Sequence, residues 1–195
     1  MNKIPPHAKK VFEGVIFDVY QWEQTLFDGT TDIFEVLKRR DGTNVIARTI
    51  DGQFLLIDEL QPTWKQMHTG LPAGSKEPGD ENILETAQRE LREETGYVSE
   101  HWKEWFVVSP ASKIEWNIHV FIADHARKEH EPTLDPGERI TTRLVSPEQF
   151  IEEACADTFR ITEVTQALYR LRAENRLHEF FALFNEESTP PTSQQ

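Results

Sequence analysis

The sequence of 195 residues contains one cysteine, Cys155, and no hydrophobic run of the roughly 20 residues needed to span a bilayer. A single cysteine excludes an intrachain disulfide and a cysteine-based zinc site. The stretch EEACADTF predicts that Cys155 is a small buried hydrophobe. The first residues, MNKIPPHAKK, lack the apolar core of a signal peptide. These absences predict a cytoplasmic protein with no membrane partner.

Basic residues are also scarce, because 21 Lys and Arg stand against 34 Asp and Glu, a formal net charge of −13. A protein that binds the backbone of nucleic acid needs a basic face, so the composition argues against that class of partner. An acidic protein that handles phosphate groups must recruit cations locally. The charge is therefore consistent with a metal-dependent site.

Apolar periodicity predicts a mixed α/β chain. Strands are predicted at 11–20, 33–40, 44–50, 53–60, 102–110 and 116–124, and helices at about 82–95, 146–155 and 161–184. Asp-Gly pairs at 41–42 and 51–52 separate apolar segments as hairpin turns do. Strands before and after a helix, followed by terminal helices, indicate an α/β layer architecture. The polar tail at 185–195 is expected to be disordered.

The stretch RELREETGY, residues 89–97, places three carboxylates on one predicted helix. Glu90 shares a helix face with Glu93 and Glu94, and like charges at this spacing cost a few tenths of a kcal/mol per pair. A solvated helix rich in ion pairs is one interpretation. The other is a divalent-cation site, because Mg²⁺ takes oxygen ligands and offsets the repulsion.

The ends and faces of this helix are marked in the sequence. Asp80 or Asn82 can cap its first turn, and Gly96 ends it as a left-handed residue. The stripe expected to be buried consists of Ile83, Leu84, Ala87 and Leu91. The acids are therefore predicted to lie off the buried face.

Residues 74–97 resemble the Nudix box, G-x5-E-x7-R-E-U-x-E-E-x-G-U, where U is aliphatic or aromatic. The matching residues are Glu81, Arg89, Glu90, Leu91, Glu93, Glu94, Gly96 and Tyr97. Six residues separate Gly74 from Glu81, where the pattern has five. Either the loop carries an insertion, or Asp80 takes the place of the first acid. A motif of this length in a loop-then-helix context favours the metal site over the solvated helix.

The resemblance extends over about residues 11–175 to the ADP-ribose and nucleotide-sugar pyrophosphatase branch of the Nudix hydrolases. The segments that carry this resemblance are EGVIFDVYQWEQTLFDGTTDIFEV, LPAG, SPASKIE and DPGERI. It implies a Nudix fold, a mixed β-sheet sandwiched between α-helices, with a small N-terminal antiparallel sheet. It also implies a homodimer, with residues 1–44 as the dimerisation region and 45–184 as the Nudix domain.

The same resemblance implies hydrolysis of the diphosphate bond in ADP-ribose or a related nucleotide sugar, which gives a nucleoside monophosphate and a sugar phosphate. The implied cofactor is Mg²⁺, with Mn²⁺ as an alternative. Its implied ligands are the Ala73 carbonyl, Glu90 and Glu94, with Glu93 as a further candidate. Arg89 is expected to orient the acids through ion pairs.

The general base is left open between Glu93, on the helix, and Glu138, in the loop TLDPGERI. We favour Glu138, because the Pro-Gly turn beside it allows the loop to close over bound substrate. By resemblance, Glu115 belongs to the substrate pocket. Arg39 is a candidate for binding the negatively charged phosphates of the substrate.

Tryptophans are the remaining candidates for the substrate pocket. Trp22, Trp64 and Trp116 flank the motif segments and have rings suited to stacking on a base; the alternative is packing in the core or at an interface. Where the branch often has arginines and a glutamate, this chain has Leu60, Thr63 and Gly70.

Two other functions remain open. One is a Nudix hydrolase of a dinucleotide or a nucleoside triphosphate, and the other is a catalytically silent Nudix domain that senses a nucleotide. The intact RELREE favours an enzyme, since a binding module has no need of every acid. The sequence does not decide the nucleobase or the sugar.

Overall fold

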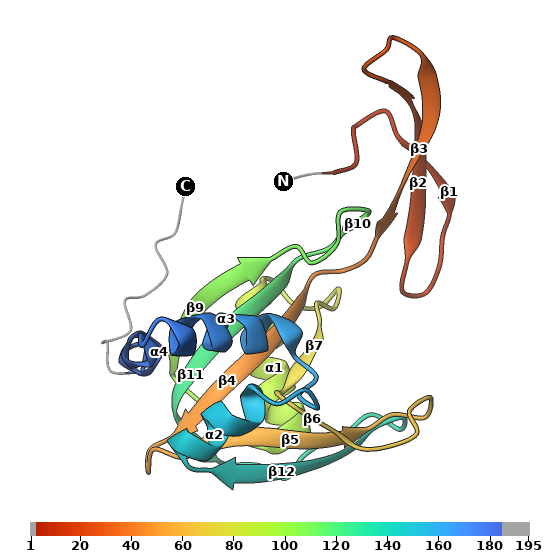
Figure 1. Ribbon diagram of the computed structural model, residues 1–195. Helices are drawn as coiled ribbons and strands as arrows, with labels where there is room; N and C mark the ends of the chain where they lie inside the picture. The colour runs from red at the N-terminus through yellow and green to blue at the C-terminus, as the bar shows by residue number, and fades with distance from the viewer. Residues whose placement is uncertain (1–2, 185–195) are drawn as a thin grey trace.

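The computed structural model describes residues 3–184, which form two β-sheets and four helices (Figure 1). The smaller sheet has the order β1-β2-β3-β10, with strands Lys9–Phe12, Asp18–Thr25, Thr31–Lys38 and Ile114–Glu115. The first three are antiparallel, as predicted, and β10 adds in parallel to β3. The predicted strand at 11–20 is wrong in its bounds, because residues 13–17 form the turn between β1 and β2. Gly14 permits this turn, since a Cβ there would collide with the Phe17 carbonyl.

The larger sheet has eight strands: five follow the order β12-β5-β4-β11-β8, and β6 pairs with β5, β7 with β4 and β9 with β11. Their bounds are β4 Gly42–Thr49, β5 Phe54–Leu60, β6 His68–Gly70, β7 Ala73–Ser75, β8 Tyr97–Val98, β9 His101–Val108, β11 Ile118–Lys128 and β12 Arg139–Val145. The sheet is mixed, because β4 and β11 are parallel while the other pairs are antiparallel. β4 and β5 pair at Arg48 and Phe54 and then separate, β4 pairing with β7 and β5 with β6.

Helices cover both faces of this sheet (Figure 1). Helix α1 (Ile83–Thr95) lies on one face, and α2 (Pro147–Ala154), α3 (Thr162–Ala173) and α4 (Leu177–Ala182) lie on the other. Alternate strand residues feed the two layers, since side chains of a strand alternate between faces. Val45, Leu55 and Ile57 pack with α1, whereas Ile46, Phe54 and Leu56 pack with the other helices. The predicted mixed sheet sandwiched between helices is confirmed.

The C-terminal helices differ from the prediction. The pattern at 161–184 forms two helices rather than one, because Asn175 adopts a left-handed conformation (φ 56°) just after α3. The helix predicted at 146–155 is present as α2, whose capping box joins Ser146 and Gln149. Among the described residues, no helix is long and apolar enough to cross a membrane.

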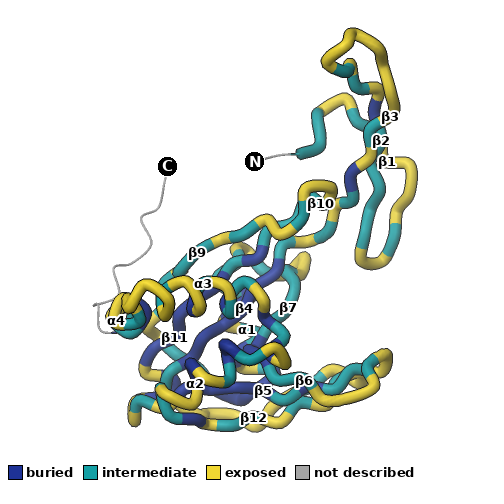
Figure 2. Tube along the Cα trace, viewed as in Figure 1, coloured by how far each residue is buried: buried dark blue, intermediate teal, exposed yellow. Residues whose placement is uncertain are grey.

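The small sheet projects from the body of the molecule, and its surface is largely exposed (Figures 1 and 2). It carries exposed apolar side chains at Val11, Phe12, Ile16 and Ile33, each more than half accessible. The division predicted at residues 44 and 45 falls inside β4, so the change of sheet lies between Lys38 and Gly42. The tail at 185–195, predicted to be disordered, lies outside the described residues.

Candidate active site

The acid helix α1 begins and ends through local backbone chemistry. Asn82 is the N-cap, and its side chain accepts a hydrogen bond of 3.0 Å from the amide of Glu85. Gly96 is the C-cap at φ 76°, where its amide donates to the Arg92 carbonyl at 2.8 Å. A Cβ at Gly96 would also collide with the His130 carbonyl. Of the two caps left open by the sequence, Asn82 is the one used.

Two of the acids lie under strand β7. Glu94 is only 4% exposed and accepts a 3.0 Å hydrogen bond from the Ala73 amide. The carboxylate of Glu90 lies against Gly74, where a Cβ would collide with it. The expectation that the acids lie off the buried face is therefore wrong for Glu94, because it lies seven residues after Ala87 and three after Leu91, on the buried face of α1.

Burial makes these two carboxylates hard to ionise. It raises the pKa of Glu90 to about 7, against the opposing effect of Arg89. Burial also raises the pKa of Glu94 well above its usual value, and the charges of Glu90, Glu59 and Glu138 raise it further. A cation placed among these groups would favour their charged forms.

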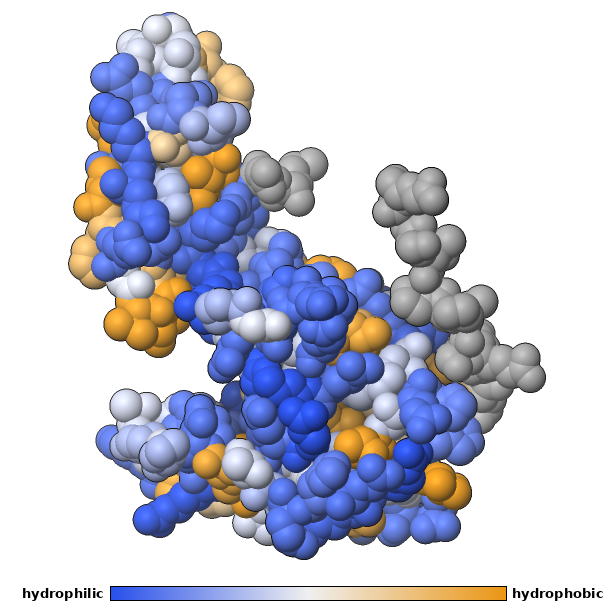
Figure 3. All heavy atoms as spheres, turned by 180° about the vertical axis from the view of Figure 1, so that it is seen from behind, coloured by the Kyte–Doolittle hydropathy of each residue, from blue (hydrophilic) through white to orange (hydrophobic). Residues whose placement is uncertain are grey.

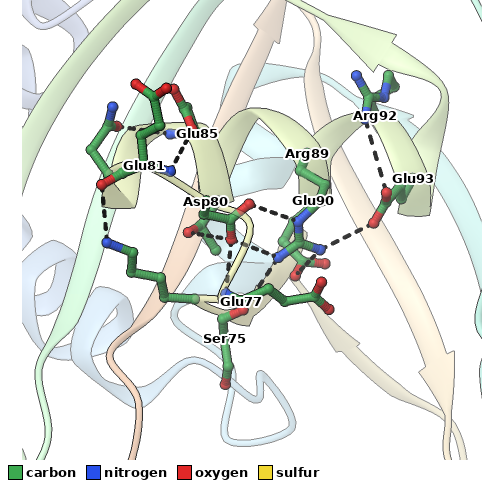
Figure 4. Close-up of polar contacts among 12 residues, drawn as sticks. Ser75, Glu77, Asp80, Glu81, Glu85, Arg89, Glu90, Arg92 and Glu93 are labelled. Atoms are coloured by element: carbon green, nitrogen blue, oxygen red, sulfur yellow. Dashed lines mark hydrogen bonds and ion pairs between the residues drawn. The ribbon is translucent and has the colours of Figure 1, made fainter.

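Arg89 connects the acids with the loop that precedes the helix (Figure 4). Its guanidinium lies 3.2 Å from Asp80, 2.9 Å from Glu90 and 3.1 Å from Glu93. It also donates to the Ser75 carbonyl at 3.2 Å. These contacts fit the predicted role of an orienting residue.

The geometry separates the two candidates for the first acid of the box. Hydrogen bonds from Arg89, together with those from the Glu77 amide and the Thr86 hydroxyl, lower the pKa of Asp80 to about 2. Glu81 is exposed, and its backbone amide, not its carboxylate, bonds to Glu85 (Figure 4). Asp80 is therefore the acid that contacts Arg89.

The three acids of RELREE do not form one cluster. The side chain of Glu93 is 37% exposed and lies with Arg89 and Arg92, apart from the buried Glu94. Within residues 3–184, no three Asp, Glu, His or Cys side chains gather closely enough to hold a metal ion. Two carboxylates and a backbone carbonyl nevertheless suit Mg²⁺, which keeps several waters and takes few protein ligands.

Glu59 joins the acids from strand β5 and was not identified from the sequence. It is 2% exposed, and its negative charge raises the pKa of both Glu94 and Glu138. Its position in strand β5 could have identified it from the sequence. Alternate residues of a strand face the same side, and Leu55 and Ile57, four and two residues earlier, face α1. An acid at the end of a buried strand row faces into the protein.

Glu138 reaches the site from the loop before β12. Its carboxylate accepts a 3.2 Å hydrogen bond from the Asp135 amide, and the Glu138 amide bonds back to the Asp135 carbonyl at 2.9 Å. Burial raises its pKa, and the charges of Asp135, Glu59 and Glu93 raise it further. A carboxyl group with a raised pKa is a better proton acceptor, as a general base requires.

A cationic cleft of about 270 Å³ lies at the junction of the two sheets. It is lined by Lys3, Lys38, Arg39, Arg40, Asp41, Ser109, Glu115, Trp116 and Asn117. The Arg39 guanidinium lies 4.1 Å from the centre of the Trp116 ring and donates to the Ser75 hydroxyl at 3.3 Å. No carboxylate within residues 3–184 pairs with Arg39. Ser75, which accepts from the Arg39 guanidinium, is also the residue whose carbonyl binds Arg89.

Glu115 lies in the same cleft but is already paired. Its carboxylate is 2.8 Å from the Lys38 amine and accepts hydrogen bonds from the amides of Lys3 (2.8 Å) and Ile4 (3.1 Å). Although burial acts to raise it, these contacts lower the pKa of Glu115. Glu115 therefore fixes the N-terminal segment at the cleft.

The predicted tryptophans lie in different places. Trp22 packs on Phe34 within the small sheet, with ring centres 6.0 Å apart, and is not among the residues that line the cleft. Trp64 lies in the loop between β5 and β6, beside His68, with the Arg160 guanidinium 5.4 Å from its ring centre. Trp116 is the one that lines the cleft, where the Arg39 guanidinium lies over its ring.

The described residues thus combine an α/β sandwich, buried carboxylates on a capped helix and a cleft lined by basic side chains. Residues 38–167 match the NUDIX domain, so the chain belongs to this family and is a Nudix hydrolase. Members of the family use divalent metal ions.

Individual relatives agree with this assignment. The chain is 29% identical over 147 residues to the ADP-ribose pyrophosphatase of Bacillus subtilis, covering 74% of this chain and 78% of that protein. It is also 29% identical over 134 residues to the methanol dehydrogenase activator of Bacillus methanolicus, covering 67% and 71%. The crystal structure of an ADP compounds hydrolase superposes with a TM-score of 0.68 at 18% identity, covering 88% of this chain and 95% of that one. This last likeness shows the fold.

The raised pKa values predict a pH dependence of stability and of cation affinity. Between about pH 4.5 and 7 the folded chain holds protons on Glu90 and Glu94 that the unfolded chain releases. The metal-free protein should therefore lose stability as pH rises through this window, while Mn²⁺ affinity rises. Urea unfolding in EDTA and Mn²⁺ titration at pH 5 to 8 measure both effects. The variant Glu90→Gln should show flatter curves, and a stability that rises with pH across this window in the wild type would contradict the prediction.

Proposed function

We propose that this chain is a Mg²⁺-dependent hydrolase, with Mn²⁺ as a possible substitute, that cleaves the diphosphate of ADP-ribose or a related nucleotide sugar. The products are a nucleoside monophosphate and a sugar phosphate. The observation that carries the proposal is the adjacency of the buried acids to the cationic cleft. Ser75 in β7 joins them, since its carbonyl binds Arg89 and its hydroxyl binds Arg39.

The proposed roles follow from this placement. Glu90, Glu94 and the Ala73 carbonyl would hold the cation, which when bound neutralises phosphate charge and acidifies a water. Arg39, a half-buried cation with no carboxylate partner in residues 3–184, is suited to a phosphate oxygen. Arg89 keeps Glu90 and Glu93 oriented.

Hydrolysis forms one bond from water oxygen to phosphorus and breaks the bridging P–O bond. Glu138 takes the proton of the attacking water and returns it to the departing phosphate; Glu93 is the alternative base. The raised pKa of Glu138 supports the first assignment, and the 37% exposure of the Glu93 side chain, paired with Arg89, weakens the second.

A hydrolysis screen tests this proposal. The purified protein is incubated with Mg²⁺ and ADP-ribose, nucleotide sugars, dinucleotides or nucleoside triphosphates, and the products are separated by chromatography. We expect AMP and ribose 5-phosphate from ADP-ribose. Preferred cleavage of a dinucleotide or a triphosphate would replace the substrate assignment, and binding without cleavage would indicate a sensor.

We also propose that the small sheet of the predicted region 1–44 forms a homodimer interface, and that the hydrolase domain predicted at 45–184 begins with β4 at Gly42. The apolar side chains Val11, Phe12, Ile16 and Ile33 lie exposed on the projecting sheet, where Figure 3 shows hydrophobic patches. Exposed apolar patches on small proteins mark contact surfaces.

Breaking this surface should release monomers. We expect sedimentation of the wild type at micromolar concentration to give a dimer, and Phe12→Glu with Ile16→Glu to give a monomer, because burying two charges in an apolar contact is costly. Tyr169→Glu, at an exposed position on α3, is the control and should stay dimeric. A monomeric wild type would disprove the interface.

A further inference from the structure

Arg160 is held beside the acid site by contacts from a distant part of the chain. It lies between α2 and α3, and its amide donates to the Thr69 carbonyl at 2.9 Å. Its side chain passes over Gly70, where a Cβ would come within 3.3 Å of the Arg160 Nε. Gly70 therefore leaves the space through which the guanidinium reaches Glu59.

The partner of Arg160 is the buried acid of the site. Arg160 Nη2 lies 2.8 Å from Glu59 Oε2, and the other oxygen of Glu59 accepts a 2.7 Å hydrogen bond from Gln61. The charge of Glu59 in turn acts on Glu94 and Glu138. The guanidinium therefore lies at the edge of the cluster of acids that includes Glu59, Glu94 and Glu138.

The ion pair with Glu59 leaves the Nε–H donor of the Arg160 guanidinium without a hydrogen-bond acceptor within residues 3–184. The 2.8 Å approach lacks the alignment of a hydrogen bond, since Glu59 Oε2 and Arg160 Nε have no hydrogen-bond partner within residues 3–184. The Glu59 side chain is 3% exposed, but that of Arg160 is 27% exposed. A guanidinium carries five N–H donors in a planar fork, so its exposed edge keeps donors for a second ligand.

The ligand expected at this edge is an anion with several oxygens. A diphosphate must approach Glu59, Glu90, Glu94 and Glu138, all of which carry or can carry negative charge. A fixed cation at their border lowers that repulsion, and the fork of arginine matches phosphate oxygens in pairs. The ring of Trp64, 5.4 Å from the guanidinium carbon, limits its movement on the other side.

We propose that Arg160 binds a phosphoryl oxygen of the substrate diphosphate, with Glu59 and Gly70 positioning its guanidinium. The inference deepens the proposed function and rests on it for the identity of the substrate. The competing explanation is that Arg160 serves only as the counter-ion of Glu59.

The test compares two variants that both lack the buried charge of Glu59. Removing Arg160 alone would leave that carboxylate uncompensated and could unfold the chain. We therefore compare Glu59→Gln with the double variant Glu59→Gln, Arg160→Gln, and use thermal unfolding to verify that both are folded. Arg127→Gln, which removes an exposed arginine paired with Glu129, is the control.

The measured quantity is the affinity for inorganic pyrophosphate in the presence of Mg²⁺, by calorimetry. The double variant should bind pyrophosphate at least about tenfold more weakly than Glu59→Gln, as expected for a lost charge-assisted hydrogen bond. Arg127→Gln should bind it as the wild type does. Equal affinities in the two Glu59 variants, or a wild type that does not bind pyrophosphate, would overturn the role of Arg160.

Activity separates this result from the proposed function. If the wild type fails to hydrolyse ADP-ribose and nucleotide sugars but shows the Arg160-dependent binding of pyrophosphate, the substrate assignment falls and the anion site stands. If it hydrolyses ADP-ribose while the two Glu59 variants bind pyrophosphate equally, the anion site falls and the proposed function stands.

Discussion

Replacing Glu94 with glutamine is expected to lower kcat by at least about a hundredfold in Mg²⁺ and to weaken Mn²⁺ binding in parallel. The reason is that Glu94 is the most buried acid of the helix and lies beside Ala73, the proposed carbonyl ligand. Stopped assays of AMP release and Mn²⁺ titration measure the two losses.

Stability distinguishes this effect from unfolding. The metal-free Glu94→Gln variant should be at least as stable as the wild type, because burial raises the pKa of this carboxyl and the neutral amide can still accept from Ala73. Glu81→Gln, at an exposed acid that makes no side-chain contact with Arg89, is the matched control and should leave kcat unchanged. Near-normal kcat and Mn²⁺ affinity in Glu94→Gln would show that the metal lies elsewhere.

Glu138→Gln should also lower kcat by at least about a hundredfold, within the range of a lost general base, while Mn²⁺ affinity changes much less. In the wild type, the raised pKa of Glu138 should produce an acid limb in the pH profile of kcat, and the variant should lose this limb. Rates between pH 5 and 9 and Mn²⁺ titration provide both readouts.

Asp135→Asn is the control that tests whether any change in this loop lowers kcat. Asp135 holds Glu138 through backbone groups, which this change retains. Its kcat should fall only a few-fold. Parallel loss of Mn²⁺ binding and turnover in Glu138→Gln would make Glu138 a metal ligand, and unchanged turnover would leave Glu93 as the base.

The sequence by itself determined the features that depend on neighbouring residues. The periodicity of residues 82–96 predicted α1, and Gly96 ends it as expected, because capping requires only local backbone geometry. Apolar segments separated by Asp-Gly turns predicted β4 and β5, and the alternation of WNIHVFIAD predicted β11, because turn residues and alternation act between neighbouring residues. The order of these elements, with the box in register, predicted the α/β sandwich and the family.

Only the tertiary structure decided which charges meet. The Glu94 carboxylate meets the Ala73 amide of β7, Glu59 joins it from β5, and Arg160 reaches Glu59 from beyond α2. Likewise, the path of the loop brings Asp80, and not Glu81, into contact with Arg89. Burial and pKa depend on contacts between segments far apart in the chain, which no local pattern records. The exposure of Glu94 is a different case, because its position seven residues after Ala87 and three after Leu91 puts it on the buried helix face by periodicity alone.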